Sequence, residues 1–232
     1  MMRTLIASFA LMLGALDVGR SIELPKGYII AEDSISPDGR YGVSVPLTQA
    51  IIDDIVKDPV NNLVEVSSGR TIARMVGNPG FTKQNHGGIM PSIWSPDSSL
   101  LLWHVDGKWF PDALTLIKLE DGRVAWQVDL LAKSQRAILA RTKEAKPELY
   151  ARAKKENEGS GSAYPEGFSV DVVAVEPVAL PMKVLVDLTS NPKGIAELTT
   201  LDSHMEAIGE KDGTFRVTNF ALGPGTSPNF RP

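Results

Sequence analysis

The sequence predicts a mainly β protein, a β-rich α+β fold in which antiparallel hairpins and meanders form the core and one amphipathic helical segment is added. Three observations indicate this class. Short runs of apolar and polar residues alternate between Tyr41 and Val128. Turn sequences rich in Gly, Pro and Asp separate these runs. Apolar residues adopt a spacing of three and four only after Leu130, as one face of a helix requires.

Composition limits the classes of function. The chain has 232 residues, of which 43% are hydrophobic, and this suits one globular domain or a compact pair of subdomains. A formal net charge of -4 gives no overall attraction to nucleic acid or to anionic lipid. The sequence has no cysteine, which excludes disulfides, thiolate metal ligands and a cysteine nucleophile. We therefore expect a protein or a small molecule as partner, and no nucleic acid.

Residues 1–21 have the pattern of a signal peptide. Arg3 gives a basic start, and an apolar run follows from Thr4 to Leu16. This run is short for a helix that crosses a membrane. We expect a periplasmic or secreted protein that is not inserted in a membrane after signal cleavage. A buried N-terminal core helix is the alternative, because apolar runs of this length occur in both settings.

Residues 22–130 predict two similar units of hairpins. Each unit opens with a Ser-Pro-Asp turn, at Ser36 and at Ser95, in which Pro has the φ angle that its position in the turn needs. The side chains of Asp38, Asp97 and Asp121 are expected to accept hydrogen bonds from neighbouring backbone N–H groups. The expected strands cover residues 41–45, 62–66 and 71–75 in the first unit and residues 100–105, 113–119 and 124–128 in the second. The same order of turns and strands thus occurs twice, as in an internal repeat.

The stretches SPDGRYGVSV…NLVEVSSGRTI and WSPDSSLLLWHV…LTLIKLEDGRV resemble repeat units of the TolB-like and WD40-like β-propellers of bacterial exported proteins. The resemblance covers less than half of the chain. It implies that the Ser-Pro-Asp turn opens an inner strand and that the Gly-Arg turn joins the outer strands. Closed propellers have four blades or more, so two units predict a truncated-propeller-like or open sandwich core. The resemblance implies no particular activity.

The rest of the chain predicts helices and then further strands. Residues 131–158 are expected to form a helix from about Ala132 to Ala145 and a second from about Pro147 to Asn157. Their excess of Lys and Arg fits a solvated face, with an acidic partner as the alternative. Residues 159–222 predict C-terminal strands that pack on the same domain. These strands are expected at 168–175 and 182–188, as a pair, and at 214–220, and residues 223–232 are expected to be a disordered tail.

The loop between the two hairpin units is the best candidate for a binding site. It places Lys83, Gln84, Asn85 and His86 next to glycines, and binding residues are often found on loops of a rigid scaffold. A plain solvent-exposed connection is the alternative interpretation.

No catalytic motif is present in the sequence. The histidines His86, His104 and His204 lack the spacing of a zinc site, and no nucleophile motif occurs. His104 is expected to be a half-buried strand residue, and His204 to precede a turn. We therefore expect no metal, no cofactor and no catalytic residue, in an exported, non-enzymatic binding or scaffold protein. The alternative is a hydrolase in which His86 acts with a distant carboxylate, because histidine is the usual general base.

Overall fold

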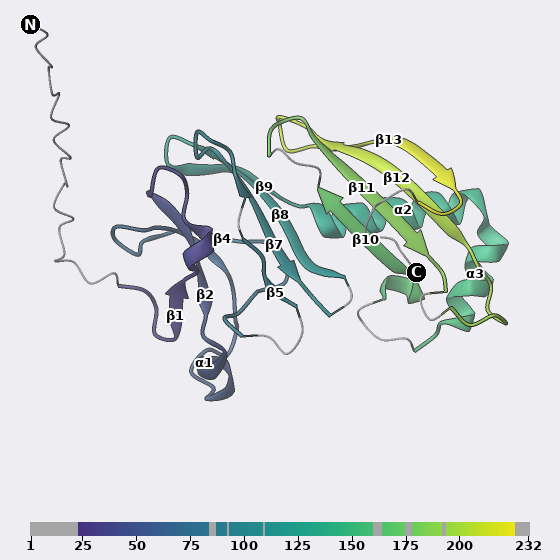
Figure 1. Cartoon of the computed structure of the whole chain (residues 1–232), viewed down its shortest axis with the longest axis horizontal. Coiled ribbons are helices and arrows are strands. Elements are labelled where there is room, and N and C mark those ends of the chain that lie inside the picture. The colour runs from purple at the N-terminus through teal and green to yellow at the C-terminus, as the bar shows by residue number, and fades with distance from the viewer. Residues whose placement is uncertain are drawn as a thin grey trace, which may run out of the picture.

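The computed structural model describes residues 23–83, 87–91, 93–108, 110–159, 164–174, 178–191 and 194–225. Three antiparallel sheets follow one another along the long axis of the molecule (Figure 1), and helices flank the third. The predicted mainly β, α+β class with an open core is confirmed. Residues 1–21, expected to be a signal peptide, lie outside the described residues. Within the described ranges, no helix is both long and apolar enough to cross a membrane.

The first sheet is a four-stranded meander. Its strands, in order, are β1 (Tyr28–Ile30), β2 (Tyr41–Pro46), β3 (Asn62–Glu65) and β4 (Thr71–Arg74). The short elements η1 (Glu32–Ser34) and α1 (Thr48–Ile52) precede and follow β2. The three strands predicted for this unit are present. The sequence analysis missed β1, η1 and α1 because three to five residues are too few to show a periodicity.

The second sheet contains β5 (Gly88–Ile89), β6 (Ile93–Trp94), β7 (Leu100–Asp106), β8 (Pro111–Glu120) and β9 (Arg123–Asp129). Its order is β5-β7-β8-β9, and β6 also pairs with β7. The predicted strands of the second unit are thus present. Each of the first two sheets has the meander order of a propeller blade, and membership of a propeller family stays a prediction.

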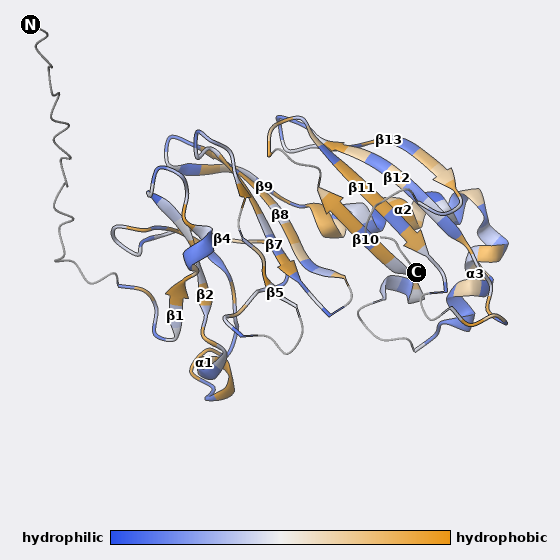
Figure 2. Cartoon of the chain, viewed as in Figure 1, coloured by the Kyte–Doolittle hydropathy of each residue, from blue (hydrophilic) through white to orange (hydrophobic). Residues whose placement is uncertain are grey.

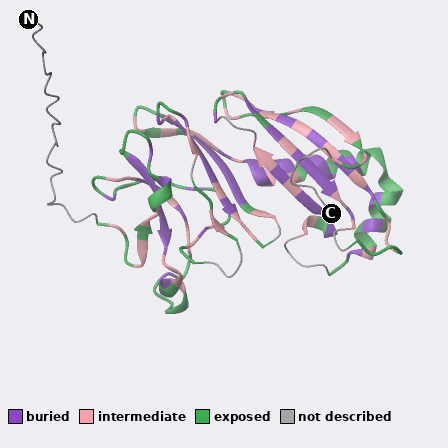
Figure 3. Ribbon diagram, in the orientation of Figure 1, coloured by how far each residue is buried: buried purple, intermediate pink, exposed green. Residues whose placement is uncertain are grey.

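Both faces of the second sheet are buried, which explains its apolar strands (Figures 2 and 3). Trp103 and Ile117 face the first sheet and pack with Val43 and Leu63. We call this apolar cluster the small core. On the opposite face, residues such as Leu116 belong to a larger apolar cluster, the large core, which extends to the helices and the third sheet.

The two predicted helices are confirmed as α2 (Leu130–Ala145) and α3 (Pro147–Glu156), followed by the short η2 (Pro165–Gly167). Helix α2 begins two residues earlier than predicted. The reason is a side-chain cap, since Asp129 accepts a hydrogen bond of 2.8 Å from the Ala132 N–H. Pro147 occupies the first turn of α3, as expected.

The third sheet is a meander of β10 (Ser169–Ala174), β11 (Met182–Thr189), β12 (Asp202–Gly209) and β13 (Phe215–Leu222). The predicted pairing of the first two strands is confirmed. The expectation for His204 is wrong, because His204 lies within β12 and faces Asp187 of β11. Strand β12 alternates buried and partly exposed residues. Its buried positions are Ser203, Met205, Ala207 and Gly209, of which only Met205 is large and apolar, so the pattern in the sequence is weak.

Helix α2 packs on one face of the third sheet and joins it to the second (Figure 1). Ile138 of α2 belongs to the large core together with Leu116 of β8 and Val184 and Val186 of β11. The C-terminal strands therefore share one apolar core with β8. Residues 226–232, most of the expected tail, lie outside the described residues.

The two Ser-Pro-Asp turns have matching hydrogen bonds. In the first, Ser36 Oγ donates to Asp38 Oδ1 at 2.6 Å and accepts from the Tyr41 N–H at 3.0 Å. In the second, Ser95 Oγ donates to Asp97 Oδ1 at 2.6 Å and accepts from the Leu100 N–H at 2.9 Å. Each Ser hydroxyl thus joins the turn to the strand that follows it.

The expected roles of the turn aspartates are confirmed at two of the three turns. Asp38 accepts from the Arg40 N–H at 3.0 Å, and Asp97 accepts from the Ser99 N–H at 3.1 Å. Although partial burial opposes it, these bonds and those of the turn serines lower the pKa of each carboxyl to about 2. Within the described part of the chain, no backbone group donates to the Asp121 side chain. Asp121 instead has a φ of 50°.

Gly39 and Gly122 occupy turn positions with φ of 72° and 74°. Replacing either residue with Val is expected to lower the free energy of unfolding by about 1–3 kcal/mol, because β-branched residues rarely adopt positive φ. At Gly39 no atom lies within 4 Å of an added Cβ, so backbone strain alone causes the loss. Urea denaturation measures the effect. Gly39→Asn is the matched control and should lose less, since Asn tolerates this conformation better. Equal losses for Val and Asn would contradict the explanation.

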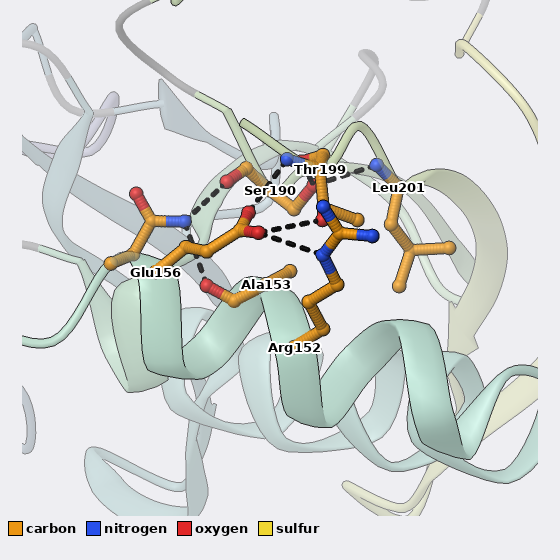
Figure 4. Close-up of polar contacts among 7 residues, drawn as sticks. Arg152, Ala153, Glu156, Ser190, Thr199 and Leu201 are labelled. Carbon is orange, nitrogen blue, oxygen red and sulfur yellow. Dashed lines mark hydrogen bonds and ion pairs between the residues drawn. The ribbon is translucent and has the colours of Figure 1, made fainter. Parts of the chain in front are cut away.

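The end of α3 is held by a carboxylate that accepts three hydrogen bonds (Figure 4). Glu156 accepts from Arg152 Nε at 2.8 Å, from the Thr199 N–H at 2.6 Å and from Thr199 Oγ1 at 3.1 Å. The bond from the Thr199 backbone, followed by that from Arg152, lowers the pKa of Glu156 below its ordinary value. The helix end is thereby joined to the segment that leads into β12.

A second set of bonds in the same region is centred on Ser190, which follows β11 (Figure 4). Ser190 Oγ accepts from the Leu201 N–H at 2.6 Å and donates to the Thr199 carbonyl at 2.9 Å. The Ser190 carbonyl accepts from Asn157 Nδ2 at 2.6 Å. These bonds close the connection between β11 and β12 on the end of α3.

Glu156→Gln is expected to lower the melting temperature at neutral pH, because the neutral amide is a weaker acceptor than the carboxylate for Arg152 and Thr199. A lowered native pKa stabilises the fold above the ordinary value of 4.5, and this contribution is lost as the pH falls through the native pKa. The difference between the two proteins should therefore shrink on acidification. Thermal melts across the acid range measure it, with the exposed Glu158→Gln as control. A difference that does not depend on pH would contradict the assignment.

Candidate functional site

The residues predicted to bind a ligand lie on the segment that leads from the first sheet to the second. Of these, Lys83 is held by Thr48 at the start of α1. The Lys83 N–H donates to Thr48 Oγ1 at 2.8 Å, and the same hydroxyl lies 2.8 Å from the Lys83 carbonyl. Gln84, Asn85 and His86 lie outside the described residues, so their part in binding stays a prediction.

The next described residues run along the end of β7. Gly88 and Ile89 pair with Asp106 and Val105. Gly87 has a φ of 75°, and a Cβ added there would overlap the Asp106 carbonyl. This close approach requires glycine at position 87. The predicted binding loop therefore ends directly beside Asp106.

A cavity of about 540 Å³ lies at this end of β7, between the second and third sheets. Its apolar lining comes mainly from β7, β8 and β10 and from the segments beside them. Four charged or titratable side chains, His104, Asp106, Lys108 and Asp171, are also part of the lining. The apolar residues and glycine of the lining are Met90, Ile93, Leu102, Gly107, Phe110, Pro111, Leu114, Val172, Val173 and Ala174.

The alternation of side chains along strand β7 determines where the polar residues of the cavity lie. Trp103 and Val105 point into the small core. Leu102, His104 and Asp106 consequently face the third sheet, because successive side chains of a strand point to opposite faces. A His-x-Asp sequence near the end of a strand thus delivers both polar side chains to one cavity.

His104 and Asp106 form a close pair, with Nε2 of the histidine 2.7 Å from Oδ1 of the aspartate. The distance is that of an ion pair. This nitrogen is buried, and among the described residues it makes no hydrogen bond of ordinary geometry.

Asp171 approaches this pair from β10 of the third sheet. Burial raises the pKa of Asp171, a hydrogen bond from the Val172 N–H opposes the rise, and Asp106 adds to it by repulsion. Asp112, whose carboxylate lies next to Gly107, also has a pKa raised by burial and by the charge of Asp106. Two carboxylates, those of Asp106 and Asp171, thus line one end of the cavity, and the exposed Asp112 lies beside it.

The polar groups of the lining are charged or titratable side chains. None of the described lining residues carries a hydroxyl or a thiol, whereas His104, Lys108 and the two aspartates are groups that can act as acids, bases or ligand contacts. Within the described ranges, no group of three or more acidic or histidine side chains is arranged to hold a metal ion. What the cavity combines is an apolar wall with carboxylates and one histidine at its end.

A smaller cavity of about 360 Å³ lies at the end of α3, beside Lys154, Asn157 and Glu166. Lys154 Nζ is 2.6 Å from Glu166 Oε2, so these two opposite charges already compensate each other. The cavity between β7 and β10 is therefore the stronger candidate for a binding site.

Part of this site follows from the sequence. His104 was expected to be a half-buried strand residue, and its partial burial is confirmed. Its pairing with Asp106 was not predicted, although the His-x-Asp spacing within a strand is a usable signal. Asp171 has no such signal, because it is distant in the sequence and reaches the cavity only through the packing of two sheets. Neither a protein-family model nor a curated protein matches this sequence.

Proposed function

We propose that this protein is a non-enzymatic binding protein whose ligand occupies the cavity between β7 and β10. The observation that carries the proposal is the lining, a large apolar wall with a few convergent polar groups, which is the usual character of ligand sites. The predicted binding loop supports it as well, since Gly87 and Gly88 lie against Asp106. The pattern of residues 1–21 further supports action in the periplasm or outside the cell.

A cavity-filling variant tests this function. Ala174 lines the cavity, and Ala174→Phe should occupy part of its volume. The probe is a library of small aromatic amines, and saturation-transfer NMR detects their binding. We expect binding to the parent protein and its loss in Ala174→Phe. The matched control is Ala151→Phe on the exposed face of α3, which should bind the amines like the parent. Binding that is equal in all three proteins, or absent from the parent, would refute the cavity as the site.

A hydrolase is the second candidate function, and one observation favours it. Gly87, which follows His86 in the sequence, lies close to the Asp106 backbone, and Asp106 is a candidate carboxylate partner for the histidine proposed as general base. Hydrolysis of p-nitrophenyl acetate by the parent protein, lost in both His86→Gln and Asp106→Asn, would support this candidate. Equal background rates in the three proteins would reject it for ester substrates.

A further inference from the structure

The cavity lies along an edge of the third sheet. Strand β10 is the first strand of that sheet, and within the described ranges it pairs with β11 alone. Four consecutive residues of β10, from Asp171 to Ala174, line the cavity. In an antiparallel pair every second residue directs its N–H and C=O away from the partner strand. Two of these four residues therefore direct their backbone donors and acceptors away from β11, toward the free side of the strand. We call residues 171–174 the β10 edge.

We propose that the cavity receives an extended segment of a partner protein, which adds to the β10 edge as a further strand and places a lysine or arginine side chain between Asp106 and Asp171. This inference rests on the proposed function and specifies the class of its ligand. Strand addition is a common mode of peptide recognition, in which backbone bonds give affinity and side-chain pockets give specificity.

The charges at the end of the cavity favour a basic side chain. Asp106 and Asp171 line it, and Asp112 stands beside Gly107. His104 and Lys108 are the groups that oppose this negative charge. Burial, followed by the repulsion of Asp106, raises the pKa of Asp171 and of Asp112, while His104 acts in the opposite direction on Asp171. A cationic side chain from a ligand would act in the same direction as His104.

The apolar wall suits the other side chains of such a strand. An added strand lies about 4.8 Å from its neighbour, and its side chains alternate between the two faces. Val172 belongs to the large core on one face of β10, whereas Asp171 lies on the other. One set of ligand side chains would then meet apolar residues such as Leu102 and Leu114, and the other would meet Asp171. A segment with alternating apolar and basic residues matches both the apolar residues on one face and Asp171 on the other.

The same aspartate selects against a second copy of this chain. If two β10 edges paired as antiparallel strands in register at residue 171, two Asp171 carboxylates would face each other across the pair. Native proteins use charged residues in this way to prevent the pairing of identical edges. A basic side chain would be attracted by Asp171, whereas the Asp171 of a second copy would be repelled by it.

Three fluorescein-labelled peptides test the inference by fluorescence anisotropy. The first is fluorescein-Val-Lys-Val-Lys-Val-amide, with the dye on its N-terminus, and the second replaces both lysines with glutamate. The third has the sequence of the first with its central valine amide N-methylated, which removes a backbone donor and keeps every side chain. We expect the first peptide to bind and the other two to bind about tenfold more weakly or not at all. Amide chemical shifts of the β10 edge should change on addition of the first peptide only.

Protein variants complete the test. Asp171→Asn should weaken the lysine peptide about tenfold and bring its affinity close to that of the glutamate peptide. Asp53→Asn, a change at an exposed residue beyond α1, is the control and should leave binding unchanged. Ala174→Phe should abolish peptide binding. Unfolding of a variant is detected by circular dichroism, and the peptide series in the parent protein decides the question without any variant.

The outcomes separate the two proposals. If the aromatic amines bind the cavity and the lysine peptide does not bind, strand addition is wrong while the cavity remains a ligand site. Equal binding of the lysine and N-methylated peptides would also overturn strand addition, because backbone pairing would then contribute nothing. Equal binding of the lysine and glutamate peptides would overturn the role of the carboxylates. If neither the amines nor the peptides bind, both proposals fail.

Discussion

Trp103→Ala is expected to lower the free energy of unfolding by about 3–5 kcal/mol. Trp103 is 1% exposed, and its ring lies in the small core between the first two sheets. Removal of the ring leaves a large cavity next to Val43 and Leu63, and two sheets cannot close around it without breaking their own pairing. Urea denaturation followed by circular dichroism measures the loss.

Trp103→Phe is the matched control, and it separates ring volume from hydrogen bonding. Within the described residues, the buried indole Nε1 of Trp103 has no hydrogen-bond partner. An unsatisfied buried donor costs about 1–3 kcal/mol, so its removal offsets part of the lost packing. We expect Trp103→Phe to change stability by less than about 1.5 kcal/mol. A loss as large as that of alanine would contradict this account and indicate a partner for Nε1 outside the described residues.

Phe168→Ala is expected to cost a similar amount, about 3–5 kcal/mol, in the large core. Phe168 has no exposed surface and stacks on Tyr150 of α3, with ring centroids 4.6 Å apart. The ring therefore holds α3 against the start of the third sheet. Its loss removes both the burial and the stacking, and stacked aromatic pairs add about 0.5–1.5 kcal/mol to the burial.

The neighbouring Leu149 offers a control on the same helix. Leu149 is 40% exposed, and Leu149→Ala should change stability by no more than about 0.5 kcal/mol. Thermal melts of both variants test the comparison. A Phe168→Ala protein that melts like the parent would show that α3 is not held by this contact. Equal losses for the two variants would indicate that α3 contributes through its helix rather than through the Phe168 side chain.

Local patterns predicted the regular elements well where the physical cause was local. The hairpins around Gly39 and Gly122 follow from turn chemistry, and the structure has both residues at positive φ. The break between α2 and α3 follows from Pro147, which lacks the N–H that a helix interior needs. Strand β12 was missed because its buried side carries, besides Met205, only small residues such as Ser203, so burial and hydropathy coincide poorly there.

The candidate site likewise has one part that follows from the local sequence and one part that depends on tertiary contacts. The His-x-Asp spacing of His104 and Asp106 is a local property of one strand, and alternation alone places both side chains on one face. Which face borders a cavity is not local. It depends on the first sheet covering Trp103 on one side and on the third sheet standing beside β7 on the other.

The mainly β class, the turns, the two helices and most strands follow from the sequence alone, because they depend on the φ preferences and side-chain periodicity of neighbouring residues. The packing of the third sheet against the second through Leu116 and Ile138, the position of Asp171 in the same cavity as Asp106, and the place of the β10 edge beside that cavity are evident only from the tertiary structure. These features depend on contacts between residues far apart in the chain. Apolar burial drives such contacts without direction, and the pattern of one strand does not specify which other strand will cover it.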